Sequence, residues 1–249
     1  WKSYYKYEAL HALCNQHLKF GDLAARMESM GAEALATGHY ARVAREEDGE
    51  WALLRAADAA KDQSYALALI PYAVLPRVIF PLGDLVKGEV RSHGRRLNLT
   101  LWDKAESQDL CFVPDGDYAR FSSEKLGETR GAEPGAFVDG AGRDVGRHRG
   151  IFHYTVGQRR GLGLAGGQPL YVIAIHPQAN TVQVGPRESL ASAGLETSTI
   201  NWLCPAPPAP GTRVEVKIRS HHEPAAATLE HTVGRACVRF DQPQSAVTP

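Results

Sequence analysis

The sequence has little cysteine and no long hydrophobic run. Its 249 residues include four cysteines, none of them in a C-x-x-C pair. This excludes a zinc ribbon, and so large a chain with so few cysteines is not a disulfide scaffold. The most apolar stretch, residues 64–83, is interrupted by three prolines and by Arg77. A membrane helix needs about 20 apolar residues, so we expect no membrane span.

Net charge is also absent, because 28 Lys and Arg balance 28 Asp and Glu. Local charge is uneven: residues 143–160 hold five Arg against one Asp, and residues 87–104 hold five basic against two acidic residues. The first segment is rich in glycine and contains Phe152, His153 and Tyr154. Basic residues among aromatics indicate nucleic-acid binding. The charge of the second segment, residues 87–104, is explained equally well by a helix face exposed to solvent as by nucleic-acid binding.

Metal-binding motifs are missing as well. H-E-x-x-H does not occur, and neither His221-His222 nor the pair His148 and His153 has a carboxylate or cysteine at ligand spacing. We therefore expect no structural metal, and histidines that face solvent or RNA. Hydrophobic residues make up 43% of the chain, enough to build a core, which excludes a disordered protein.

The periodicity of the first hundred residues predicts an α/β domain. We expect helices at 17–30, 61–70 and 82–97, the last with Asp84 as a candidate cap, and a short strand at 33–37. Residues 41–45 and 51–56 flank Asp48-Gly49, which is a hairpin signal. A further helix is expected at 116–126.

Short strands dominate the second half of the chain. We expect them at 170–175, 181–185, 212–219 and 227–233, and many short strands with turn signals favour a small β-barrel. Residues 161–166 spell G-x-G-x-x-G, but a strand pattern follows where a dinucleotide fold needs a helix. The glycines therefore indicate a tight loop, which Arg159 and Arg160 could bring to a phosphate backbone.

The polar run Lys61-Asp62-Gln63-Ser64-Tyr65 has two interpretations. It is either a plain N-terminal helical turn with Asp62 near the helix dipole, or a place where Lys61 and Gln63 hold a phosphate or polynucleotide. The residues alone leave both open.

Six motifs in order resemble the tRNA-specific 2-thiouridylases, from about Cys14 to the C-terminus. They are Cys14-Asn15, Lys19-Phe20, Ala36-Thr37-Gly38-His39-Tyr40, Lys61-Asp62-Gln63-Ser64-Tyr65, Ser107-Gln108-Asp109-Leu110-Cys111-Phe112, and Tyr154-Thr155-Val156-Gly157-Gln158-Arg159-Arg160-Gly161-Leu162-Gly163. The resemblance implies ATP-dependent adenylation of the wobble uridine of tRNA, followed by sulfur transfer. It further implies a sulfur-donor or sulfur-relay protein as partner and Mg with the ATP.

The resemblance also implies roles for single residues. Cys111 would carry a persulfide, and Cys14 would assist and close a disulfide with it. Gly38 would belong to the ATP site. The implied tRNA-binding residues are His39, Lys61, Asp62, Gln63, Arg159, Arg160, Arg219 and Ser220. Ser220 departs from the family, in which an aromatic residue is usual at this position.

The implied architecture has three parts. We expect the remainder of an ATP-pyrophosphatase-type, Rossmann-like α/β domain at 1–104, a central tRNA-binding domain at 105–166, and a C-terminal β-barrel at 167–249. The family's S-G-G-x-D-S ATP loop is absent, as are its Asn-Pro pair before the first cysteine and its closing barrel strands. We therefore expect a chain truncated at both ends and inactive as it stands.

Two alternatives remain beside the sulfurtransferase. One is a tRNA-binding module without catalysis, since the barrel and basic loop are present while the ATP loop is not. The other is a different ATP-pyrophosphatase such as an amidating ligase, which needs no thiol pair. The lack of a targeting segment favours the cytoplasm.

Overall fold

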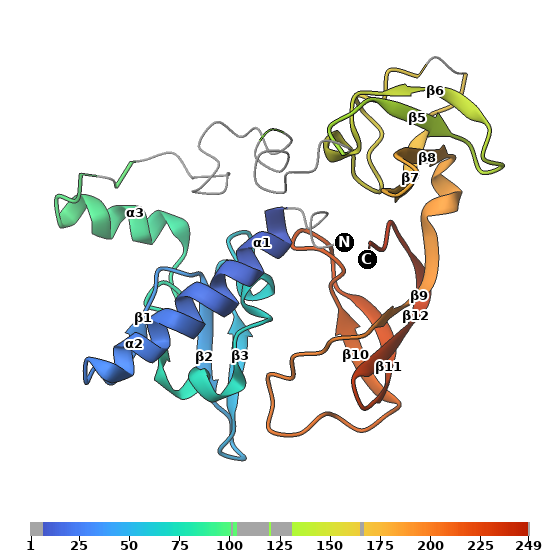
Figure 1. Cartoon of the computed structure of the whole chain (residues 1–249). Helices are drawn as coiled ribbons and strands as arrows, with labels where there is room; N and C mark the ends of the chain where they lie inside the picture. Colours follow the sequence, from blue (N-terminus) through green and yellow to red (C-terminus); the bar gives the residue numbers. More distant parts are fainter. Residues whose placement is uncertain (1–6, 101, 104–119, 121–130, 165–166, 249) are drawn as a thin grey trace.

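The computed structural model describes residues 7–100, 102–103, 120, 131–164 and 167–248. They form three units, each with its own hydrophobic core (Figure 1). The expected combination of an α/β domain, a small central domain and a C-terminal β domain is confirmed. The helix expected at 116–126 lies outside the described residues, apart from Arg120. No helix in the described ranges has the length and apolar character that a membrane crossing requires.

A long helical segment begins the described chain. It consists of α1 (Tyr7–Cys14), a π-helical turn η2 (Asn15–Asp22) and α2 (Leu23–Ser29). The predicted helix is confirmed, but it begins earlier and is π-helical where the family motif lies. Gly31, at φ +71°, follows the end of α2, a conformation that glycine adopts readily after a helix. π-Helical turns are rare and often mark functional positions.

The first unit contains two small pairs of strands. β1 (Leu35–Ala36) pairs in parallel with β4 (Val78–Ile79), and β2 (Ala41–Arg45) forms a hairpin with β3 (Trp51–Arg55). The hairpin is confirmed at the predicted positions, and Gly49 in its turn has φ +87°. The α1 to α2 segment packs beside these strands (Figure 1). Phe20, Leu67 and Leu75 are among the fully buried residues of the core.

The helix expected at 61–70 was wrong. Within 61–70 the chain makes only a short 3₁₀ turn, η3 (Ser64–Leu67). A second 3₁₀ turn, η4 (Tyr72–Arg77), follows it. The side chain of Asp62 explains this, since its Oδ1 accepts from the amides of Ala56 at 2.9 Å and Ser64 at 3.3 Å. A short acceptor that bonds nearby amides stabilises a turn in competition with a helix.

The third predicted helix is present but shorter than expected. α3 (Lys87–Arg96) begins after Val86, whose amide donates to Glu89 Oε2 at 2.9 Å. Asp84 is therefore not the cap. Its carboxylate lies 3.6 Å from Arg42 instead, in an exposed ion pair to the β2 strand.

The middle unit is a four-stranded sheet in the order β6-β5-β8-β7, with the short turn η5 (Ile151–His153) beside it. Its strands are β5 (Gly135–Val138), β6 (Asp144–His148), β7 (Tyr171–His176) and β8 (Thr181–Gly185). β7 and β8 match predicted strands, whereas β5 and β6 were not predicted. The boundary expected at 166/167 falls between strands of this one sheet. We propose instead that the central unit extends to Gly185.

The C-terminal unit is an antiparallel sheet in the order β10-β11-β12-β9, preceded by the turn η6 (Arg187–Leu190). Its strands are β9 (Ala191–Thr197), β10 (Thr212–Val216), β11 (Ala225–Thr232) and β12 (Arg235–Ser245). β10 and β11 were predicted, with bounds a few residues off, whereas β9 and β12 were not. Buried and exposed residues alternate along β12 from Arg235 to Phe240, as a half-buried strand requires.

Specific contacts join the C-terminal unit to the first unit. Asn201 Nδ2 donates to the carbonyls of Ala68 and Ile70, both at 2.8 Å, and Leu203 packs against the core of the first unit. Tyr65 Oη donates to Ile218 O at 3.4 Å. The C-terminal sheet thus lies beside the η3 turn of the first unit (Figure 1).

Candidate functional site

Cys14 lies at the last position of α1, where the helix passes into the π-helical turn. It is half-buried and a free thiol. Its neighbour Asn15 is only 2% exposed and donates from Nδ2 to Ala66 O at 3.0 Å, which fixes the helix against the η3 turn. Cys111 lies outside the described residues, so its expected pairing with Cys14 stays a prediction. The three described cysteines, Cys14, Cys204 and Cys237, are all free.

His39 lies in a closed aromatic environment after β1. Its ring is 6.0 Å from that of Phe20 and 5.9 Å from that of Phe80. Its Nε2 lies 3.3 Å from Lys19 Nζ and its Nδ1 lies 2.8 Å from Thr37 Oγ1. Only 8% of the residue is exposed, so its polar atoms face these partners. Gly38 beside it is exposed, and a Cβ there would meet only Leu82 Cδ1 at 3.8 Å.

The charge of His39 follows from this environment. Burial is the main cause that lowers its pKa to about 4, and the neighbouring Lys19 and His11 lower it further. The side chain is therefore neutral at pH 7. A neutral ring with Nδ1–H toward Thr37 leaves Nε2 as the acceptor for the ammonium of Lys19.

We expect this burial to make the protein sensitive to acid. Below the unfolded pKa of 6.5 the unfolded chain binds a proton that folded His39 refuses until about pH 4, so stability is lost as pH falls through that window. The loss is about 3 kcal/mol at pH 4 for this shift. Urea unfolding between pH 4 and 7 measures it.

His39→Phe is the matched variant, because phenylalanine keeps the packing against Phe20 and Phe80 and cannot take a proton. Its slope of stability against pH should be smaller than that of the wild type. Part of the slope should remain, since burial also lowers the pKa of His148. An unchanged slope would show that His39 does not titrate in this window.

The turn that holds Lys61, Asp62 and Gln63 is tied to the segment that holds Gly38 and His39. The amide of Gln63 donates to Tyr40 O at 2.8 Å, and Gln63 Oε1 accepts from the Tyr40 amide at 2.9 Å. Asp62 Oδ2 accepts from Ser64 Oγ at 2.8 Å. Both side chains therefore shape the turn, while Lys61 is half-buried at its start.

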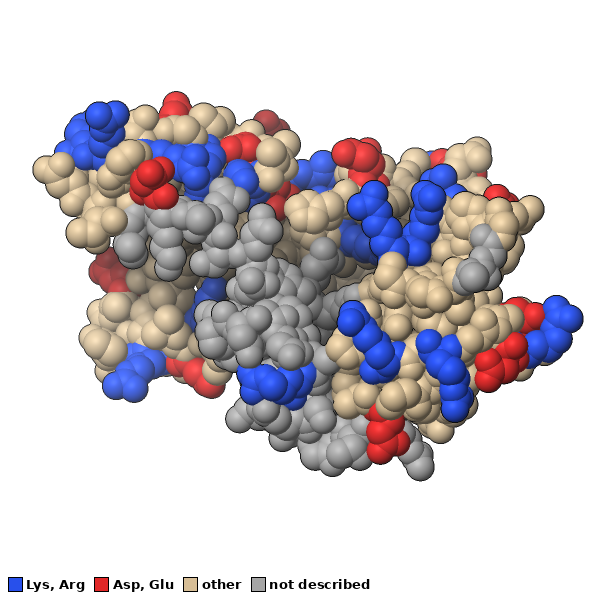
Figure 2. Space-filling model, turned by 90° about the horizontal axis from the view of Figure 1, so that it is seen from above, with Lys and Arg blue, Asp and Glu red and all other residues tan. Residues whose placement is uncertain are grey.

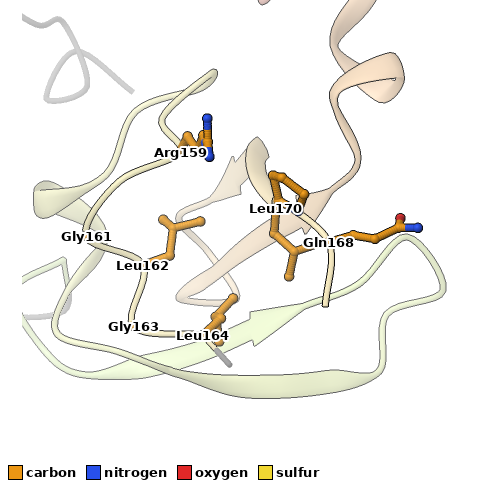
Figure 3. Close-up of a pocket in the computed structure, with 8 residues that line it drawn as sticks. Arg159, Gly161, Leu162, Gly163, Leu164, Gln168 and Leu170 are labelled. Atoms are coloured by element: carbon orange, nitrogen blue, oxygen red, sulfur yellow. The ribbon is translucent and has the colours of Figure 1, made fainter. Parts of the chain in front are cut away.

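Arg159 and Arg160 lie in a second region, on the glycine-rich loop before β7. Both are exposed, and Gln158 shapes the loop by accepting from the Thr155 amide and donating to Arg160 O. The dinucleotide-binding interpretation of the G-x-G-x-x-G motif at 161–166 is excluded, as expected, because the strand β7 and not a helix follows the loop. The loop borders an open pocket of about 230 Å³ into which Leu162, Leu164 and Leu170 point (Figure 3). Ligand pockets usually measure about 300–1,000 Å³, so we assign it no small molecule.

Arg219 connects this second region to the C-terminal unit. Its guanidinium donates to Ala246 O and, at 3.5 Å, to Val156 O, three residues before Arg159. It is half-buried, as is Ser220. The structure thus groups the expected site residues in two sets, one around His39 and the Gln63 turn, the other around Arg159 and Arg219. Cys14 lies on the helical segment whose Asn15 and Lys19 contact the first set.

The basic residues expected to contact nucleic acid lie on the surface. Arg147, Arg149, Arg159 and Arg160 are exposed, while Arg143 is paired with Asp139 at 2.7 Å. Figure 2 shows Lys and Arg side chains at both ends of one face of the molecule, over the central unit and over α3. A phosphate backbone could contact both groups.

One expectation about histidine was wrong. His148 faces neither solvent nor RNA: it is 2% exposed, packs on Phe137 and Tyr154, and bonds Asn180 O and the Gly150 amide. Within the described ranges no three ligand-type side chains converge as a metal site would need.

Two residues beside Cys14 were quoted in motifs but given no role: Asn15 and Lys19. The sequence alone does not readily show that an asparagine and a lysine on a helix are buried, because such residues usually lie on its solvated face. The position of Lys19 next to the apolar Phe20 was the one sequence feature that indicated a lysine close to the core.

Comparison with known proteins fits this arrangement. Three family models match in order: a tRNA methyl transferase HUP domain at residues 10–115, a tRNA methyl transferase PRC-barrel domain at 123–186, and an aminomethyltransferase β-barrel domain at 192–249. The fold and these matches define a class of proteins built from a Rossmann-like HUP domain, a PRC-barrel and a C-terminal β-barrel.

The relatives identify the family within that class. Proteins named tRNA-specific 2-thiouridylase are 46% identical in Chloroflexus aurantiacus over 237 residues, 44% in Koribacter versatilis over 243, and 46% in Acidithiobacillus ferrooxidans over 240. They match 95%, 96% and 96% of this chain. The chain belongs to the tRNA-specific 2-thiouridylase family. It spans 66%, 66% and 67% of the length of these relatives.

Proposed function

We propose that the protein of which this chain is a part places sulfur on C2 of uridine in tRNA. The observation that carries the proposal is the match to 2-thiouridylases over 95% of the chain. It is supported by the free thiol of Cys14, which lies on the helical segment whose Asn15 and Lys19 contact the η3 turn and His39. Methyl transfer, which two domain names suggest, needs no such thiol. We further propose the cytoplasm as its location.

ATP is the proposed activating substrate, with Mg as its ion. When bound, it supplies the adenylyl group that turns the C2 oxygen into a leaving group. Of the residues described, the exposed backbone at Gly38 fits such a ligand, because no side chain lies closer than van der Waals contact to it. The S-G-G-x-D-S loop is not part of this sequence. The chain alone is therefore proposed to be inactive.

The two cysteines are proposed to share the sulfur step. Cys111 holds the incoming sulfur as a persulfide, and the outer sulfur bonds to uridine C2 as the activated oxygen leaves. The Cys14 thiolate attacks the inner sulfur, so a Cys14–Cys111 disulfide forms and the sulfane sulfur is reduced. A thiol reductant then restores both cysteines, and a sulfur-relay protein reloads Cys111.

The tRNA is proposed to lie across both sets of expected site residues. Arg159 and Arg160 are exposed side chains suited to phosphate contacts, which give affinity without reading sequence. Lys61 and the Gln63 turn belong to the set of site residues around His39. To be reached, the target uridine must leave the stack of its neighbours.

The test is sulfur transfer by the full-length protein. It is incubated with tRNA, ATP, Mg and a persulfide donor, and nucleosides from the digested tRNA are separated by mass. The proposal expects 2-thiouridine that depends on ATP, and none with the 249-residue chain. Binding of tRNA without 2-thiouridine would favour the alternative of a tRNA-binding module.

A further inference from the structure

Lys19 is a half-buried cation that has no countercharge among the described residues. Its only hydrogen-bonding contact in the described part of the chain is the 3.3 Å approach to His39 Nε2, and no described carboxylate lies within ion-pair distance. A cation that is partly removed from water is usually paired, because losing hydration costs free energy. An ammonium has three N–H donors, and one bond to His39 leaves two of them for another group.

The contact with His39 fixes where these donors lie. His39 is held on its other nitrogen by Thr37 Oγ1 at 2.8 Å and on its faces by Phe20 and Phe80. Phe20, next to Lys19, is 1% exposed and anchors the π-helical turn in the core. A lysine side chain that is normally flexible is therefore held at one place by a rigid acceptor.

The positive charge of Lys19 acts on two neighbouring histidines. Lys19 contributes to the lowered pKa of both His39 and His11, so each of these histidines is held neutral partly by its charge. A site with a fixed ammonium and two neutral imidazoles favours an anion over a cation.

Lys19 also lies close to Cys14 along the helix. In a π-helix the amide of one residue bonds to the carbonyl five residues before it, so Lys19 lies one turn beyond Cys14. Asn15 on the same turn is 2% exposed, and its Oδ1 has no partner in the described structure.

We propose that Lys19 binds a phosphate group at the Cys14 site and that His39 is the positioning residue that holds its ammonium in place. This rests on the proposed function, since either substrate, the nucleotide or the tRNA backbone, would supply the phosphate. Lysine is a common phosphate ligand that acts as a point charge.

The test measures binding by the full-length protein in two arms. One arm titrates an anticodon stem-loop RNA at several salt concentrations, and the other titrates inorganic pyrophosphate by calorimetry. Lys19→Gln removes the charge, Lys19→Arg keeps it, and Arg45→Gln on the exposed β2–β3 hairpin is the matched control. Urea unfolding confirms that each variant is folded.

If the RNA supplies the phosphate, Lys19→Gln weakens RNA binding about threefold to tenfold and lowers the salt slope by about 0.7. If a nucleotide supplies it, pyrophosphate binding falls and the RNA arm does not change. In both cases Lys19→Arg keeps most of the affinity, Arg45→Gln matches the wild type, and His39→Phe shows part of the loss.

Folded Lys19→Gln that binds both probes like the wild type would overturn the proposal, as would Lys19→Arg losing as much as Lys19→Gln. These results leave the proposed function standing, because wild-type RNA binding and 2-thiouridine formation test it separately. Full-length wild-type protein that binds neither probe also overturns the role of Lys19.

Discussion

Cys14→Ser in the full-length protein is expected to lower sulfur transfer to uridine by about a thousandfold or more, the scale seen when a reacting nucleophile is removed. The hydroxyl is close in size to the thiol, and Cys14 is only half-buried, so the fold should be kept. A hydroxyl does not attack a persulfide sulfur as a thiolate does. The readout is 2-thiouridine per minute in digested tRNA.

Cys237→Ser and Cys204→Ser are the matched controls. Cys237 is exposed on β12 and Cys204 is half-buried in the loop after β9, and neither lies in a site region. Both variants should keep activity near that of the wild type. Cys111→Ser should fail like Cys14→Ser. Sulfur transfer by Cys14→Ser at a rate within tenfold of the wild type would remove Cys14 from the mechanism.

Gly83→Ala is expected to have the largest effect on stability. A Cβ at Gly83 would lie 2.0 Å from Ala41 O and 2.7 Å from Arg42 Cγ. Ala41 is fully buried and begins β2 directly after His39 and Tyr40, so its carbonyl cannot move aside alone. Overpacking of this kind costs typically 1–3 kcal/mol, and we expect about 3 kcal/mol because the obstacle is backbone.

Gly88→Ala is the control for that substitution. Gly88 lies in α3, and a Cβ there meets nothing within 4 Å. Alanine in a helix is favoured over glycine by up to about 1 kcal/mol, so this variant should be slightly more stable. Urea midpoints measure both changes. A Gly83→Ala midpoint equal to that of the wild type would mean that β2 can shift without cost.

Local pattern was sufficient for much of the secondary structure. The β2–β3 hairpin followed from Asp48-Gly49 between two strand-like runs. β8 followed from a short β-branched run, and β10 followed from alternation of apolar and polar residues. The helix expected at 61–70 failed because Asp62 bonds the amides of Ala56 and Ser64, a preference that periodicity does not register. β5 and β6 were missed since a short glycine-containing strand becomes regular only by pairing, and β5 pairs in parallel with β8, more than 40 residues away.

The sequence by itself determined the family, the three-part organisation and the residue types of the chemistry, because these depend on ordered local motifs. Only the tertiary structure decided which residues meet. In the folded chain His39 is buried between Phe20 and Phe80 and hydrogen-bonds to Lys19. Gln63 hydrogen-bonds to Tyr40, and Arg219 donates to the carbonyls of Val156 and Ala246. Burial and hydrogen-bond partners come from segments distant in sequence, and these contacts set the charge of His39 and the orientation of Lys19.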